Sequence, residues 1–190
     1  MKADEKVYEA YLKSKQGKLY FNQIKEYTSL SNSSLQNVLN KLVEEGILKL
    51  NKTKSNTFYQ INNKKQFTLK FSGIAVQKFN KLNIGVKVPL KDFIRKIPKT
   101  VFTIVLFGSA STKEEQDGSD IDLLIVLDSK INLEEIRNEV EAASKYPISI
   151  FECSSSQFLE GKDHVVIQAK KTGFPIYKEQ NFYEVILDEY

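Results

Sequence analysis

The sequence contains one cysteine, one histidine and no tryptophan in 190 residues. Because Cys153 has no second cysteine to pair with, an internal disulfide bond is excluded. The shortage also excludes a zinc site built from several cysteine and histidine ligands. With His164 as the lone histidine, serine-protease and cysteine–histidine catalysis are disfavoured.

Long apolar runs are also missing. The longest apolar stretches have the length of strands, so no segment predicts a membrane-spanning helix. The first residues, MKADEKVYEA, lack the apolar core and the small-residue cleavage site of a signal peptide. A composition of 41% hydrophobic and 27% charged residues is typical of a soluble globular protein with one large domain or two small ones. We therefore expect a cytoplasmic protein that does not contact a membrane.

Acidic residues are scarce in the first half of the chain. Residues 1–100 carry 20 Lys and Arg but 7 Asp and Glu, a balance of +13, whereas residues 101–190 carry 8 and 17, a balance of −9. A basic half favours a polyanionic partner. The alternative is a lysine-rich surface whose charges are simply solvated.

Residues 4–62 show the pattern of three helices followed by a hairpin. Apolar residues recur at helical spacing around Tyr8, the stretch FNQIKEYT predicts a short second helix, and a third begins after Ser31, a suitable N-cap. Gly46 is placed to follow the end of that third helix. The runs ILKLN and TFYQIN, joined by the polar tip KTKSN, then predict a β-hairpin.

This pattern resembles a winged helix-turn-helix domain. The resemblance implies that the third helix is a recognition helix and the hairpin a basic wing, both of which would contact DNA or RNA. The expected nucleic-acid-binding residues are Ser33, Ser34, Gln36, Asn37, Lys41, Lys52 and Lys54. The alternative is a structural or protein-binding module, which Glu44 and Glu45 favour. A homodimer on a palindromic site is an arrangement open to such a domain, although no segment is a clear dimerisation helix.

The next region is ambiguous. The stretch KKQFTLKFSGIAVQKFNKLN fits a helix, but its apolar residues also alternate as in a strand. PLKDFIRKIPKT predicts a short amphipathic helix that begins at Pro89. We treat residues 63–88 as a connector between a winged helix at 1–62 and a second domain at 89–190.

The second domain contains the stretch LFGSASTKEEQDGSDIDLLIVL, residues 106–127. VFTIVLF before it predicts a buried strand, after which Gly108 lets the backbone turn and Ser109 can present its hydroxyl and nearby N–H groups to an anion. Turns use both residue types everywhere, so this pair alone is weak. DIDLLIVL predicts a second buried strand, on which Asp120 and Asp122 share a face. Two such carboxylates suit magnesium, unless Asp120 merely caps the turn.

Together, Gly108-Ser109 and the Asp120-Ile121-Asp122 motif resemble the signature of the nucleotidyltransferase superfamily, which includes DNA polymerase beta and the minimal nucleotidyltransferases. The resemblance covers roughly residues 90–180 and implies a mixed-sheet α/β domain. It implies that Gly108 and Ser109 hold the triphosphate of a nucleotide, with ATP the first choice. Asp120 and Asp122 would be the catalytic residues and would bind Mg²⁺.

The sequence departs from that pattern in two places. The superfamily places a third carboxylate on the strand that corresponds to PISIFEC, where Ser149 stands instead; Glu152 reaches that face only if the strand bulges. Many minimal members also have an arginine where Thr112 stands here, which leaves Lys113 as the candidate cation for the phosphates. The alternative is that Lys113 is a solvated lysine on the helix. We expect His164 to be structural or exposed and Cys153 to be a small buried hydrophobe.

The sequence therefore predicts an N-terminal winged helix followed by a nucleotidyltransferase domain. The leading hypothesis is Mg²⁺-dependent transfer of a nucleoside monophosphate to an acceptor hydroxyl, which can lie on a toxin-like partner protein. The missing third carboxylate leaves enzymatic turnover uncertain. The alternative is a transcriptional regulator whose second domain binds nucleotide without turnover, and a weaker one is a scaffold with neither activity.

Overall fold

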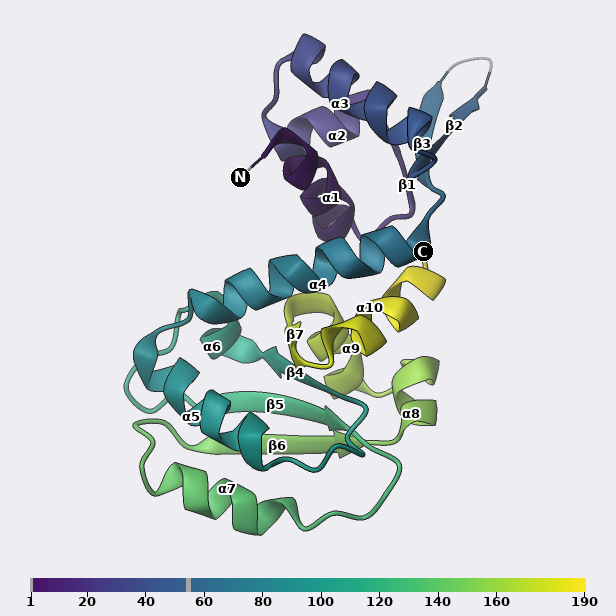
Figure 1. The fold of residues 1–190 in the computed structure, drawn as a ribbon. Coiled ribbons are helices and arrows are strands. Elements are labelled where there is room, and N and C mark those ends of the chain that lie inside the picture. The colour runs from purple at the N-terminus through teal and green to yellow at the C-terminus, as the bar shows by residue number, and fades with distance from the viewer. Residues whose placement is uncertain (1, 54–55) are drawn as a thin grey trace. The chain divides into compact units, whose positions relative to one another are not determined.

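The computed structural model describes residues 2–53 and 56–190. The chain divides into two compact units (Figure 1). One comprises residues 1–74 and 183–190, and the other comprises residues 75–182. Each unit is considered by itself below.

The first unit has the elements of a winged helix. Helices α1 (Ala3–Ser14), α2 (Phe21–Thr28) and α3 (Asn32–Glu44) precede a hairpin of β2 (Leu48–Lys52) and β3 (Thr57–Ile61), as predicted. The sequence analysis missed β1 (Lys18–Tyr20), whose three residues are too few to show a periodicity. β1 pairs antiparallel with β3, which gives the sheet order β1-β3-β2. This N-terminal arrangement confirms the predicted fold class.

The two predicted ends of α3 are correct. The backbone N–H of Ser34 donates to the Ser31 Oγ over 3.3 Å, so Ser31 is the N-cap. Gly46 follows the helix with a φ of +69°, and the N–H of Ile47 donates to the Leu42 carbonyl over 2.9 Å. A glycine occupies this left-handed conformation without the strain that a Cβ would bring.

An aromatic cluster forms the core of the first unit. The ring of Phe67 packs edge-on against Tyr8, Tyr11 and Phe71, with centroid separations of 4.8, 5.3 and 5.6 Å. The Tyr11 hydroxyl is buried and donates to the Tyr59 carbonyl over 2.8 Å, which ties α1 to the sheet. Burial raises the pKa of Tyr11, because the low-polarity surroundings disfavour its anion.

The region expected to be a connector is helical. Residues from Lys64 to Asn80 form α4, which resolves the ambiguity between helix and strand in favour of helix. The next helix, α5, spans Ile84–Lys96 and therefore begins five residues before Pro89. The prediction that Pro89 starts this helix was wrong, because Asn83 occupies the N-cap position and the proline lies inside the helix. Among the described residues, no helix is long and apolar enough to cross a membrane.

The second unit is built on a mixed four-stranded sheet. Its strands are β4 (Thr103–Phe107), β5 (Ile121–Val126), β6 (Ile148–Cys153) and β7 (Phe174–Tyr177). The sheet order is β6-β5-β4-β7, with β4 antiparallel to β5 and β7 and with β5 parallel to β6. β4 and β5 are the two central strands, and nearly all of their side chains are apolar and buried, as the two apolar runs predicted.

Helices complete the second part of the chain. In addition to α5, these are α6 (Gly108–Thr112), α7 (Leu133–Glu141), α8 (Ser155–Glu160), α9 (His164–Thr172) and α10 (Glu179–Asp188). α5 packs against α7, whereas α9 packs against β4 and β5. The short α6 directly follows β4, so the Gly-Ser turn lies at the end of a central strand of the sheet.

The aromatic cluster leads to a stability prediction. Replacement of the fully buried Phe67 by Ala should lower the free energy of unfolding by about 3–5 kcal/mol, because it opens a cavity among aromatic rings. The matched control is Leu69→Ala on the same helix, where 46% of the side chain is exposed and the cost should be below about 1 kcal/mol. Chemical denaturation followed by circular dichroism measures both; equal losses would contradict this description of the core.

Candidate functional site

The turn after β4 brings Gly108 against a carboxylate. Gly108 has a φ of +67°, a conformation that favours glycine. A Cβ atom at this position would lie 2.1 Å from the Asp122 Oδ2, which is far inside a van der Waals contact. The turn therefore requires glycine for two independent reasons, backbone conformation and space.

The two predicted aspartates lie at the start of β5, beside this turn. Antiparallel pairing sets Asp122 opposite Phe107, the last residue of β4, and Asp120 precedes the strand by one residue. Burial raises the pKa of the Asp122 carboxyl, and the nearby negative charge of Asp120 raises it further. Both effects disfavour the ionised carboxyl of Asp122, so a bound cation would stabilise it.

The third strand adds a hydroxyl where the superfamily pattern has a carboxylate. Parallel pairing sets Ser149 of β6 beside Asp122, and the Ser149 Oγ donates a hydrogen bond to the Asp120 Oδ2 over 2.8 Å. The pairing of β5 with β6 is regular from Ile148 to Cys153, without a bulge. Glu152 consequently faces the other side of the sheet from Ser149, and the possibility that it completes the site is not realised.

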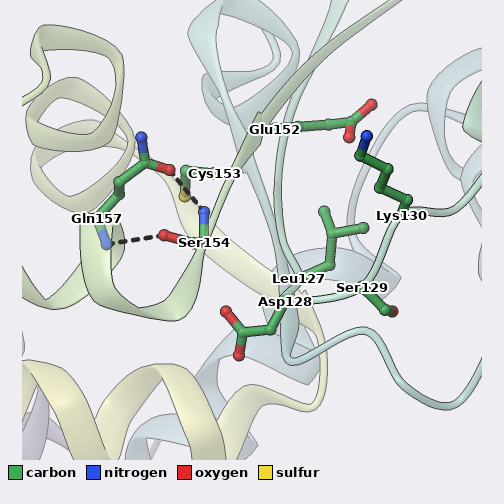
Figure 2. A pocket seen from close by; sticks show the side chains of 8 residues that line it. All are labelled: Leu127, Asp128, Ser129, Lys130, Glu152, Cys153, Ser154 and Gln157. Atoms are coloured by element: carbon green, nitrogen blue, oxygen red, sulfur yellow. Dashed lines mark hydrogen bonds between the residues drawn. The ribbon is translucent and has the colours of Figure 1, made fainter.

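Glu152 instead lines a separate pocket of about 250 Å³ at the opposite, carboxyl ends of β5 and β6 (Figure 2). Residues 127–130, after β5, and 152–154 with Gln157, around the end of β6, form its walls. Gln157 and Ser154 exchange two hydrogen bonds there, of 2.8 and 3.2 Å, that cap α8. Cys153 in this wall is buried, which raises the pKa of its thiol to about 11 and keeps it an unreactive hydrophobe.

The remaining predicted residues of this site lie on α6 and just after it. Ser109 is half-buried, and its carbonyl accepts a 3.0 Å hydrogen bond from the Glu114 N–H. Lys113 ends the helix in the left-handed conformation, with a φ of +64°, and is exposed. Thr112, at the position of the superfamily arginine, donates to the Ser109 carbonyl and to Glu114. His164 is exposed at the start of α9, as expected.

A residue that the sequence analysis missed stands on the same face. Phe151 follows Ser149 by two positions on β6, is 39% exposed, and has its ring 5.7 Å from that of Phe107. An exposed aromatic ring therefore lies on the strand that carries the Ser149 hydroxyl. The alternation of side chains along PISIFEC could have revealed it, because Ser149 and Phe151 are two residues apart.

The donors present fit a magnesium ion. Two carboxylates share one face, and the missing side chain of Gly108 leaves room for the Asp122 carboxylate beside the turn. Magnesium prefers oxygen ligands and commonly takes one or two carboxylates together with phosphate and water. Among the described residues, no group of three or more His, Cys, Asp or Glu could hold a metal ion, so this set of two would depend on substrate oxygens.

The predicted nucleic-acid-binding residues that the structure describes lie on α3 and on β2 of the hairpin. Four of them are exposed on α3, namely Ser33, Gln36, Asn37 and Lys41, whereas Ser34 is half-buried. Lys52 lines a groove of about 350 Å³ between α3 and the hairpin, together with Gln36 and Tyr59. Lys54 lies outside the described residues. At least three of these side chains have partners within the protein. Gln36 donates to Asn40 over 2.8 Å, Lys41 pairs with Glu45 at 3.8 Å, and the Ser33 hydroxyl shares a 3.3 Å hydrogen bond with that of Ser31.

The comparison with family models found a match within the second unit. Residues 89–173 match the family described as "Nucleotidyltransferase domain", which is less than half of the chain. The matched segment contains the Gly108 turn and both aspartates. No curated protein matches the chain.

Three solved structures show weaker likenesses. A toxin-antitoxin with AMP-PNP is 20% identical, with a TM-score of 0.41, over 54% of this chain and 81% of its own. A mutant of the toxin-antitoxin MntA-HpeT is also 20% identical, with a TM-score of 0.41, over 57% and 83%. TrmBL2, an archaeal chromatin protein, is 15% identical, with a TM-score of 0.28, over 87% and 70%. Scores this low carry no argument about function.

The Gly108 turn leads to a second prediction. Gly108→Ala should lower the free energy of unfolding by about 1–3 kcal/mol or more. The new residue would be strained in the left-handed backbone conformation, and its Cβ would clash with the Asp122 carboxylate. Gly118→Ala is the matched control, because Gly118 has a φ of +89° but nothing within 4 Å of its added Cβ. Thermal unfolding of both variants measures the difference. If Gly118→Ala is as damaging as Gly108→Ala, backbone strain alone explains the effect.

Proposed function

We propose that this protein transfers a nucleoside monophosphate from a nucleoside triphosphate, with ATP the first choice, to an acceptor hydroxyl in a Mg²⁺-dependent reaction. The observation that carries the proposal is the contact of the Gly108 turn with the Asp122 carboxylate, with Asp120 on the same face of the sheet. The match of residues 89–173 to a nucleotidyltransferase domain supports it.

Each residue of the site would have a separate role in this reaction. The backbone of Gly108 and Ser109 would hold the triphosphate, Lys113 would add a positive charge near it, and Asp120 and Asp122 would hold magnesium. Magnesium, when bound, supplies positive charge that stabilises the transferred phosphoryl group and the leaving pyrophosphate. The acceptor oxygen forms a bond to the α-phosphorus while the bond from that phosphorus to the bridging oxygen breaks. The proton of the acceptor hydroxyl passes to an aspartate of the pair or to water.

The acceptor class that we favour is a hydroxyl on a partner protein. The resemblance of residues 90–180 to minimal nucleotidyltransferases supports this choice, because members of that group can act as antitoxins that modify a toxin. The first unit would act separately, as a DNA-binding winged helix. Its support is the net charge of this unit, +4 from 13 Lys and Arg against 9 Asp and Glu, and the exposed polar face of α3 beside Lys52.

A second candidate function is favoured by one specific observation. Ser149 occupies the position at which the superfamily pattern has its third carboxylate, and its hydroxyl is bound to Asp120. A site with this change could bind nucleotide without turnover. The protein would then be a transcriptional regulator in which nucleotide binding controls the DNA-binding unit.

Calorimetric titration of ATP and GTP tests the nucleotide site. Binding should require magnesium and should fall by at least about tenfold in the double variant Asp120→Asn/Asp122→Asn, because the amides lose the negative charge that attracts the cation. Asp117→Asn, a nearby residue that is 90% exposed and paired with Lys145, should bind as the unaltered protein does. Transfer to an acceptor should disappear in the same double variant. Unchanged turnover there would falsify the assignment.

Salt dependence tests the winged helix. The DNA-binding constant falls as salt is added, and the slope of its logarithm against the logarithm of the salt concentration reports the number of phosphates neutralised. If Lys52 neutralises one phosphate, Lys52→Ala should make this slope smaller by about one unit. Lys162→Ala is the control, since Lys162 lies in the second unit and pairs with Glu160 at 3.2 Å. Fluorescence anisotropy on duplex DNA supplies both slopes. An unchanged slope in Lys52→Ala would remove the wing from the interface.

A further inference from the structure

We propose that Ser149 is a positioning residue that orients Asp120 and limits the site to one divalent cation. The inference rests on the proposed function and concerns how the same site binds its metal. Three observations support the inference: the register of β6, the hydrogen bond from Ser149 to Asp120, and the charges at this end of the sheet.

The register determines which side chain of β6 faces the aspartates. β5 and β6 run parallel, with Asp122 beside Ser149 and Ile125 beside Glu152. Side chains two residues apart on a strand share a face, so Asp120, Asp122 and Ser149 project together while Glu152 projects to the opposite face. Without a bulge in β6, Ser149 is the residue of this strand that reaches the carboxylates.

The hydrogen bond restrains a carboxylate that would otherwise be mobile. Asp120 is exposed and lies just before β5, where the strand does not yet hold it. The 2.8 Å bond from the Ser149 Oγ fixes the position of its Oδ2, while the second oxygen stays available to a cation. On the other side, the Gly108 turn confines Asp122. Both carboxylates are therefore held before any ligand arrives, which lowers the entropic cost of binding one.

The charges at the site match one cation. Apart from the phosphates of a nucleotide, Asp120 and Asp122 supply at most two negative charges, which suit one divalent ion. The Ser149 hydroxyl is neutral, and its proton is committed to Asp120. A second ion would need another anionic protein ligand at this end of the sheet. Glu152 of β6 lies in the pocket at the opposite end, and the Glu141 carboxylate accepts a hydrogen bond from the Ile148 N–H. Among the described residues, no group of three or more His, Cys, Asp or Glu side chains could hold a metal ion. The sequence change to serine thus has a specific consequence for metal stoichiometry.

Manganese counting tests the proposal on the full-length protein. Mn²⁺ is titrated in the presence of a non-hydrolysable ATP analogue, and the metal bound per protein-bound nucleotide is counted by electron paramagnetic resonance and equilibrium dialysis. The unaltered protein should bind one Mn²⁺ per bound nucleotide. Ser149→Asp should bind two, because a third carboxylate then stands beside Asp120.

Two further variants separate positioning from a general structural role. Ser149→Ala should still bind one Mn²⁺ but about tenfold more weakly, because a hydrogen bond to a charged group is lost. Ser149→Thr keeps the hydroxyl and should restore most of the affinity. Ser129→Ala, in the pocket of Figure 2, is a serine control that should bind normally. Circular dichroism confirms that each variant is folded.

The outcomes distinguish the two proposals. Two Mn²⁺ per nucleotide in the unaltered protein, one in Ser149→Asp, or full affinity in Ser149→Ala would each overturn the role of Ser149 while leaving the nucleotide site in place. Absence of manganese-dependent nucleotide binding in the unaltered protein would overturn the proposed function, and the role of Ser149 with it.

Discussion

The pairing of β5 between β4 and β6 is the constraint on which the candidate site depends. β4 sets Phe107 opposite Asp122, so the Gly108 turn that follows must approach the Asp122 carboxylate. β6 sets Ser149 beside the same residue. A shift of either strand by one residue would turn these side chains to the other face and separate the group. The apolar and buried side chains of β4 and β5 hold the register, because a shift would also expose them.

The site shows how a buried framework supports an exposed charge cluster. Burial raises the pKa of Asp122, and the charge of Asp120 adds to the effect, so the arrangement costs stability in the absence of a cation. Such a cost is typical of functional sites, where local stability is given up for a preorganised ligand position. The opposite end of β5 differs, since Asp128 there accepts hydrogen bonds of 2.8 and 2.7 Å from the Ser155 N–H and Oγ, which lower its pKa.

The two units offer different chemistries to partners. The first carries 13 Lys and Arg against 9 Asp and Glu, a balance of +4, and has an exposed polar helix suited to a polyanion, whereas the second carries 15 of each, a balance of zero. A nucleoside triphosphate is also a polyanion, so in the proposed function the second unit would bind it through glycine, serine and a cation rather than through carboxylates alone. The proposed function thus gives the units separate roles, one toward nucleic acid and one toward nucleotide.

The sequence alone determined the elements whose signals are local. Ser31 and Gly46 mark the two ends of α3 by capping chemistry, and the apolar runs of β4 and β5 identify buried strands. It also placed Asp120 and Asp122 on one face, because the two-residue repeat of a strand needs no partner. Local signals failed for the three-residue β1 and for α5, where the N-cap at Asn83 outweighs the tendency of Pro89 to begin a helix. Only the tertiary structure decided that β6 has no bulge to bring Glu152 to the aspartates and that the Ser149 hydroxyl donates to Asp120, because the register between β5 and β6 is set by contacts between strands distant in the chain.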